Sequence, residues 1–205
     1  AIESAIETLE QYPDCGAVGG RILLLDGTLQ EAGSIVFSNG SCRGYGRHAE
    51  PDAPEYMFRR PVDYCSAAFL LVNTALFREM GGFDLDYAPA YYEDSDFCLR
   101  LRERGLVVVY DPRAVITHFE FASSGGLKQA GKLQTEHRKV LTAKHQSLLA
   151  NQPVADETPL LQARTANGHP NVLVIDDRVP HPSLGSGYPR SREILSILAS
   201  SNFNV

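Results

Sequence analysis

The hydrophobic pattern at the start of the chain changes from the period of a helix to that of a strand. Apolar side chains recur at helical spacing over residues 2–9, which predicts an opening helix that ends before Pro13. Residues 17–25 form an apolar run that is typical of a buried strand, and residues 33–37 predict another extended segment. We therefore expect a helix followed by a hairpin-like pair of strands.

The next stretch lacks any sustained period. Residues 38–60 are rich in Gly, Pro, Arg and charge, so we predict a long loop, and long loops in compact domains often shape binding sites. The apolar run at 62–72 predicts a strand, and residues 74–80 predict a short helix closed by Gly81-Gly82.

A cluster of acidic residues then predicts the start of a helix. After a polar loop at 84–92, the chain reads Glu93-Asp94-Ser95-Asp96, and acidic residues stabilise a helix N-terminus. Phe97 and Leu101 form an apolar i, i+4 face on this helix, and Gly105 ends it.

Two short strands and a polar helix follow. Residues 106–110 and 114–117 predict strands on either side of Asp111-Pro112, so His118 would stand where the chain leaves the sheet. Residues 127–149 predict one polar helix.

The last 55 residues indicate a second domain. Residues 151–170 have the Pro-rich, weakly apolar composition of a linker, which separates a domain at 1–150 from a segment at 171–205. Residues 172–175 predict a buried strand, followed by a Gly/Pro-rich loop and a helix from about Ser191. This is the first β-loop-α unit of an α/β domain. Both ends of the chain are expected to continue into a longer protein.

Composition narrows the possible functions. With 43% hydrophobic residues, 205 residues suffice for one ordinary domain, and the net charge of −6 without a basic cluster argues against a nucleic-acid partner. The four cysteines are scattered without a C-x-x-C pair, which favours reduced thiols in the cytoplasm over disulfides or zinc. No apolar stretch reaches the roughly 20 residues of a membrane span.

Several residues carry candidate chemistry, each beside a structural alternative. A carboxylate of the cluster Glu93, Asp94 and Asp96 could act as a general base, although spacing alone favours helix capping. His118 could bind a divalent cation through its neutral imidazole, or serve as a hydrogen-bonded structural histidine.

Two further patterns are weaker. The D-x-D letters at Asp84-Leu85-Asp86 and Asp94-Ser95-Asp96 follow a Gly-Gly turn or begin a helix, so we reject both as metal motifs. Gly185-Ser186-Gly187 could cradle a phosphate or form a flexible turn, and the sequence leaves these alternatives open.

Four linked motifs in the first 150 residues together resemble the C-terminal half of family 2 glycosyltransferases. They are Val62-Asp63-Tyr64-Cys65-Ser66-Ala67-Ala68, Gly81-Gly82-Phe83-Asp84, Tyr92-Glu93-Asp94-Ser95-Asp96-Phe97-Cys98-Leu99-Arg100-Leu101-Arg102 and Ile116-Thr117-His118. Their order and spacing match the family, which raises the catalytic interpretation of Asp94 above the capping interpretation. Ala67 and Asn73 depart from it, because many members have Gly and Arg there.

The resemblance implies a partial GT-A fold, an α/β fold of the nucleotide-diphospho-sugar transferase type. It implies an inverting transfer of a sugar from a nucleotide-sugar donor to a glycan or lipid-linked saccharide acceptor, with a divalent cation (Mn or Mg). Asp94 would be the base and Glu93 its support, and His118 would complete the metal's ligands. Asp63, Ser66 and Tyr92 would lie near the substrates.

The family's nucleotide-binding half would precede Ala1, so these 205 residues are not expected to bind a donor by themselves. Residues 172–190 resemble the first strand and glycine loop of a family 4, GT-B glycosyltransferase, a Rossmann-like domain. Such a fusion would fit bacterial surface-polysaccharide synthesis in the cytoplasm, and leaves open peripheral association of the full protein with the inner face of the membrane.

Two other classes compete with this interpretation. One is a non-catalytic module that binds a glycan or a partner with the same fold, and the other is a sugar-phosphate nucleotidyltransferase. Retention of both Asp94 and His118 favours the enzyme.

Overall fold

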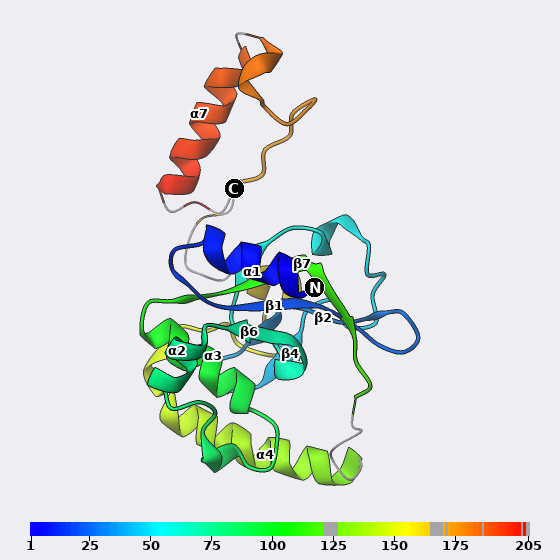
Figure 1. The fold of residues 1–205 in the computed structure, drawn as a ribbon, viewed down its shortest axis with the longest axis vertical. Helices are drawn as coiled ribbons and strands as arrows, with labels where there is room; N and C mark the ends of the chain where they lie inside the picture. The colour runs from blue at the N-terminus through cyan, green and yellow to red at the C-terminus, as the bar shows by residue number, and fades with distance from the viewer. Residues whose placement is uncertain (121–126, 165–169, 171, 186, 202, 204–205) are drawn as a thin grey trace. The chain divides into compact units, whose positions relative to one another are not determined.

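The computed structural model describes the chain except for residues 121–126, 165–169, 171, 186, 202 and 204–205 (Figure 1). The chain forms two compact units, Ala1–Thr158 and Pro159–Val205. The first unit is a mixed α/β structure built on a five-stranded sheet.

Strand β1 (Cys15–Leu23) is the centre of this sheet, and most of its residues are buried. β7 (Val107–Thr117) pairs with it in parallel. β6 (Leu70–Val72) and β2 (Leu29–Ala32) pair antiparallel with successive parts of β1, and β5 (Arg60–Val62) pairs antiparallel with β7. The sheet is therefore mixed.

The chain departs from the predicted pair of strands around Asp111-Pro112. β7 is one strand, and its register against β1 shifts where Gly20 and Arg21 pair with Asp111 and Val115. At this shift a Cβ on Gly20 would overlap the Ala114 carbonyl oxygen. Glycine is therefore required where the backbones of β1 and β7 approach each other.

Helix α1 (Ile2–Gln11) lies on one face of the sheet, and α3 (Glu93–Glu103) lies on the opposite face (Figure 1). Ala5 of α1 packs against Val18, and the Thr8 hydroxyl donates to the buried Asp111 carboxylate at 2.6 Å. Both helices were predicted from their periodicity, and both are confirmed.

The long loop predicted at 38–60 is present for most of its length, but it contains a short strand and a 3₁₀ turn. β4 (Cys42–Gly44) pairs with β3 (Ser34–Val36), and a 3₁₀ turn, η1, covers Pro54–Tyr56. A three-residue strand is too short to establish a period of two, so the pattern gave no signal for it.

The prediction of one strand over 62–72 was also wrong. β5 ends at Val62, and the 3₁₀ turn η2 (Ala67–Phe69) separates it from β6. Ser66 caps this turn, because its hydroxyl accepts a hydrogen bond from the Ala68 N–H at 3.3 Å. The apolar run therefore contains a turn between two strands.

The remaining helical elements of this unit come before and after α3 in the chain. They are α2 (Thr74–Glu79), η3 (Leu85–Tyr87), α4 (Leu127–Lys144) and α5 (Gln146–Leu149). The single helix predicted over 127–149 is interrupted at His145, which leaves helical geometry at φ −110° and ψ 31°.

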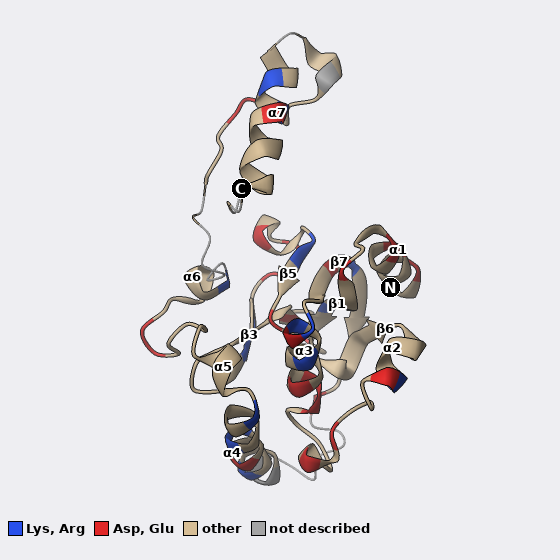
Figure 2. Cartoon of the chain, turned by 90° about the vertical axis from the view of Figure 1, so that its left-hand side faces the viewer, with Lys and Arg blue, Asp and Glu red and all other residues tan. Residues whose placement is uncertain are grey.

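A buried ionic cluster joins α3 to α4 and α5. Asp96, which is fully buried, contacts Arg100 Nε at 2.7 Å, Lys144 Nζ at 2.7 Å and His145 Nε2 at 2.9 Å. His145 Nδ1 also contacts Glu103 at 2.7 Å. In Figure 2 the acidic residues of α3, which include Glu103 of its last turn, are red and its arginines are blue.

This cluster should make stability depend on pH. Burial opposes the charge on Asp96, but hydrogen bonds from His145, Lys144 and Arg100 outweigh it and lower its pKa from 3.8 to about 2. Burial also opposes the positive charge on His145 and so lowers its pKa. The hydrogen bonds to Asp96 and Glu103 outweigh this effect and raise the pKa above 6.5 overall. The Asp96 contribution is lost as pH falls from 3.8 towards 2, and the His145 contribution is lost as pH rises above 6.5.

We therefore expect the cluster to stabilise the fold most between pH 3.8 and 6.5. Urea unfolding of the wild type and of His145→Gln across pH checks this, since their difference in unfolding free energy should shrink above pH 6.5. An equal difference at acidic and alkaline pH would contradict it.

The second unit contains α6 (Leu160–Arg164), η4 (Pro182–Leu184) and α7 (Gly187–Ser200), with no strand among its described residues. The strand predicted at 172–175 was wrong: Leu173 and Ile175 are 85% and 87% exposed, and no described strand pairs with them. Ser186 of the predicted glycine loop lies outside the described residues. Among the helices described in either unit, none has the length and apolarity to cross a bilayer.

Candidate functional site

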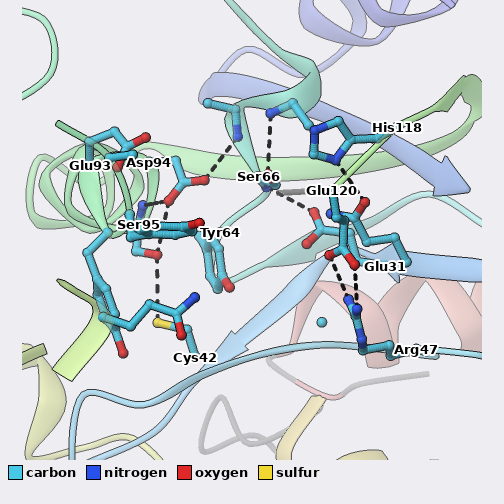
Figure 3. Close-up of a pocket in the computed structure, with 18 of the residues that line it drawn as sticks. Glu31, Cys42, Arg47, Tyr64, Ser66, Glu93, Asp94, Ser95, His118 and Glu120 are labelled. Atoms are coloured by element: carbon cyan, nitrogen blue, oxygen red, sulfur yellow. Dashed lines mark hydrogen bonds and ion pairs between the residues drawn. The ribbon is translucent and has the colours of Figure 1, made fainter. Parts of the chain in front are cut away.

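A cavity of about 580 Å³ lies at the N-terminus of α3 (Figure 3). Its walls come from β2, β4, the segment before β6, the first turn of α3 and the end of β7. The lining residues are Gln30, Glu31, Cys42, Gly44, Arg47, Tyr64, Ser66, Ala67, Ala68, Ala90, Tyr91, Tyr92, Glu93, Asp94, Ser95, His118, Phe119, Glu120 and Gln134.

The structure brings most of the predicted site residues to this one cavity. Ser66, Tyr92, Glu93, Asp94 and His118 all line it, although the sequence separates the first from the last by 52 positions. Their roles in chemistry stay predictions.

Asp63 is placed differently. One of its carboxylate oxygens accepts the Val36 N–H at 2.9 Å, and the other contacts Arg102 Nη1 at 2.9 Å. It is absent from the described cavity lining. In this arrangement Asp63 ties β3 to α3, which is a structural task.

Asp94 extends from the first turn of α3 towards the segment at Ser66 (Figure 3). Its Oδ2 accepts the Ala67 N–H at 3.1 Å, and its Oδ1 accepts the Ser95 N–H at 2.7 Å. Burial raises the pKa of this carboxyl, although these hydrogen bonds act in the opposite direction. Asp94 therefore supports the helix start and also presents a carboxylate to the cavity.

Glu93 adds a second carboxylate beside it. Its Oε2 is buried and has no hydrogen-bond partner among the described residues. Burial and then the neighbouring charge of Asp94 raise its pKa. A buried carboxylate oxygen without a partner is costly, so a hydroxyl group of a bound ligand would be favoured there.

The turn that delivers the chain to these two residues is strained. Tyr91 and Tyr92 both adopt the left-handed region, at φ 76° and 74°, where residues other than glycine are uncommon. His137 on α4 holds the turn, because its Nδ1 lies 2.9 Å from the Tyr91 carbonyl oxygen. Such strain gathers at functional sites, and the sequence pattern gave no sign of it.

His118 stands at the end of β7, as predicted, and faces the cavity. Its Nδ1 lies 2.9 Å from Gln30 Oε1, and an amide oxygen only accepts hydrogen bonds, so Nδ1 carries the proton in this arrangement. The neutral ring then has its lone pair on Nε2, the form that binds a metal. Within the described part of the chain, no three His, Cys, Asp or Glu side chains converge to hold a metal ion.

Glu31 is a cavity residue that sequence reasoning missed. It lies on β2, is only 4% exposed, and accepts hydrogen bonds from the Ser66 N–H at 2.9 Å and the Ser34 hydroxyl at 2.8 Å. Burial raises its pKa to about 7. β2 is only four residues long and Gln30 precedes Glu31 in it, so the sequence gave no clear signal for a buried glutamate here.

Arg47 and Glu120 were missed as well. They form a two-point ion pair in which Nη1 contacts Oε1 at 2.9 Å and Nη2 contacts Oε2 (Figure 3). The pair joins the loop after β4 to the end of β7 at the cavity wall. The pair compensates the positive charge of Arg47.

Cys42 also borders the cavity. Burial raises the pKa of its thiol to about 12, so it is neutral at physiological pH and unsuited to nucleophilic attack. All four cysteines are free.

Comparison with known proteins adds relatives of named activity. No protein-family model matches the chain. It is 31% identical over 152 residues to the N-acetylglucosaminyl-diphospho-decaprenol L-rhamnosyltransferase of Mycobacterium tuberculosis. The aligned region covers 67% of the chain and 48% of that protein. It is 30% identical over 122 residues to the O-antigen biosynthesis protein RfbC of Myxococcus xanthus, covering 55% of the chain and 9% of that protein.

A third relative is the rhamnosyltransferase WbbL of Escherichia coli, at 40% identity over 58 residues, or 28% of the chain and 22% of that protein. The chain thus spans less than half the length of each of these relatives. By sequence it is a relative of glycosyltransferases that include two rhamnosyltransferases.

Proposed function

We propose that this chain is the acceptor-side part of an inverting, GT-A type glycosyltransferase of bacterial surface-polysaccharide synthesis. The donor would be a nucleotide sugar, with a nucleotide-activated deoxyhexose such as L-rhamnose as the first candidate, given the names of the relatives. The acceptor would be a glycan or a lipid-linked saccharide. We place the protein in the cytoplasm, at the inner face of the membrane.

The observation that carries this proposal is the carboxylate of Asp94 at the cavity. Inverting transfer needs an ionised carboxylate that takes the proton of the acceptor hydroxyl as its oxygen attacks the sugar. Asp94 lines the cavity, the Ala67 N–H fixes its Oδ2, and burial raises its pKa, which makes it a stronger base than an exposed aspartate. In this mechanism the unpartnered Oε2 of Glu93 accepts a hydrogen bond from another acceptor hydroxyl.

A divalent cation, Mn²⁺ or Mg²⁺, belongs to this proposal. The hydrogen bond from His118 to Gln30 leaves Nε2 of the neutral ring free to bind a metal, so His118 would supply one ligand. Oxygens of the donor diphosphate would supply further ligands. When bound, the cation would neutralise negative charge on the leaving diphosphate.

The test is transfer by the purified full-length protein, not by these 205 residues alone, from a panel of nucleoside-diphosphate sugars that includes L-rhamnose, with a polyprenyl-diphosphate-linked N-acetylglucosamine as acceptor. The proposal expects a glycosylated acceptor with inverted anomeric configuration. Release of pyrophosphate from a sugar phosphate and a nucleoside triphosphate would instead assign a nucleotidyltransferase. Glycan binding without transfer from any donor would assign a binding module.

His118→Ala should raise the concentration of Mn²⁺ or Mg²⁺ that half-saturates transfer by about 10- to 100-fold, the range seen when support of a metal site is lost. Titration of donor-dependent Mn²⁺ binding, followed by its electron paramagnetic resonance, provides a readout that is independent of turnover. His48, which lies in a loop outside the cavity lining, gives the matched control His48→Ala. An unchanged metal titration would assign His118 a structural role.

A further inference from the structure

Glu31 and Asp94 hold two consecutive backbone amides from opposite sides of the cavity. Glu31 on β2 accepts the Ser66 N–H at 2.9 Å, and Asp94 on α3 accepts the Ala67 N–H at 3.1 Å (Figure 3). The two carboxylates are 63 positions apart in the sequence. The fold brings both of them into contact with one short segment, Ser66–Ala67.

The direction of the Asp94 carboxylate depends on this segment. Its Oδ1 is held by Ser95 of its own helix turn, so the Ala67 N–H is the contact from outside α3 that orients Oδ2. The Ala67 N–H follows Ser66 directly in the chain. A displacement of Ser66 would therefore carry the Ala67 amide with it and turn the carboxylate.

Glu31 is well placed to prevent that displacement. Its side chain is 4% exposed, its other oxygen accepts the Ser34 hydroxyl at 2.8 Å, and both of its oxygens are thus fixed. A buried carboxylate costs free energy that a neutral side chain would avoid, so its retention beside the cavity calls for a function.

We infer that Glu31 is a positioning residue, which fixes the Ser66–Ala67 amides and thereby aims Asp94 at the acceptor hydroxyl. This inference rests on the proposed function of Asp94 as the base. It predicts that the reach of the Glu31 side chain matters more than its charge, because the contact needed is an oxygen that accepts the Ser66 N–H.

Two variants separate reach from charge. Glu31→Gln keeps the length and retains an amide oxygen that accepts the Ser66 N–H, and the Ser34 hydroxyl can accept from the new amide nitrogen. Glu31→Asp keeps the charge but withdraws the carboxylate by one methylene. We expect Glu31→Asp to lower kcat for rhamnosyl transfer by about 10²-fold with KM for the donor little changed, since misplacement of about 1 Å has this cost. Glu31→Gln should recover most of the rate.

A double-mutant cycle that combines Glu31→Asp with Asp94→Asn shows whether Glu31 acts through Asp94. In the Asp94→Asn background, Glu31→Asp should cost less than about 3-fold, because the group that it positions has already lost its function. Equal costs in both backgrounds, a normal kcat in Glu31→Asp, or a Glu31→Gln as slow as Glu31→Asp would each overturn the inference. The surface residue Glu79, which pairs with Arg104 at 2.7 Å, provides the control Glu79→Asp with unchanged kcat.

The outcomes also separate this inference from the proposed function. Normal transfer by Asp94→Asn would overturn the proposed function and the role of Glu31 with it. Inactive Asp94→Asn together with fully active Glu31→Asp would overturn only the role of Glu31. Thermal unfolding of each variant accompanies the kinetics, since a purely structural role would lower Tm and leave kcat of the folded protein unchanged.

Discussion

Asp94→Asn should lower the rate of sugar transfer by about 10²- to 10⁴-fold, the usual contribution of a general base. Asparagine keeps the shape of the side chain, and its amide oxygen can still accept the Ala67 N–H that Asp94 Oδ2 accepts at 3.1 Å. It cannot take a proton from the acceptor hydroxyl. Steady-state kinetics with a nucleotide-activated L-rhamnose measures the loss in kcat, and KM for the donor should change little.

Glu93→Gln is the matched comparison, because it changes the neighbouring carboxylate of the same helix turn. The proposed roles give it the smaller loss, since an amide oxygen can still accept a hydrogen bond from the acceptor. If Asp94→Asn kept near-normal turnover while Glu93→Gln abolished it, the roles within the pair would be reversed.

The parts of the fold that the sequence predicted well are those with long local periodicity. α1 and α3 each span about three turns, and the acidic residues at the start of α3 marked its boundary at Glu93. Short extended segments failed for the opposite reason. The apolar run at 172–175 has the composition of a strand, but a strand also needs a partner, and partners are not encoded locally.

The residues of the candidate site also divide into those that a local sequence pattern predicted and those that it did not. Asp94 and His118 belong to short motifs with a recognisable spacing, so the sequence identified them. Glu31 contacts Ser66 across 35 positions, and Arg47 contacts Glu120 across 73, so no local pattern joins them. Asp63 is the predicted site residue that lies outside the described cavity lining, with its carboxylate in contact with Val36 and Arg102, and its role near the substrates stays a prediction.

Asp96 shows how two acidic residues of one helix turn take different tasks, and its replacement should have a large effect on stability. Asp96 lies two positions after Asp94, which turns its side chain roughly 200° around the helix, towards Lys144 and His145 instead of the cavity. Asp96→Ala would leave these two groups and Arg100 without their shared buried acceptor. Removing one partner of a buried pair costs about 3–5 kcal/mol, and we expect about 3 kcal/mol here because Lys144 is 32% exposed.

Urea unfolding at pH 6 measures this loss, and Glu103→Ala is the matched control. Glu103 also contacts His145, at 2.7 Å, but its side chain is 40% exposed. Solvent screens an ion pair of that kind, so its loss should cost about 1 kcal/mol or less. The fraction of Asp96→Ala that remains folded should retain most of its transfer activity, because Asp96 has no place in the cavity lining. A stable but inactive Asp96→Ala would instead move this carboxylate from the scaffold into the catalytic machinery, and with it the assignment of the base to Asp94 would have to be reconsidered.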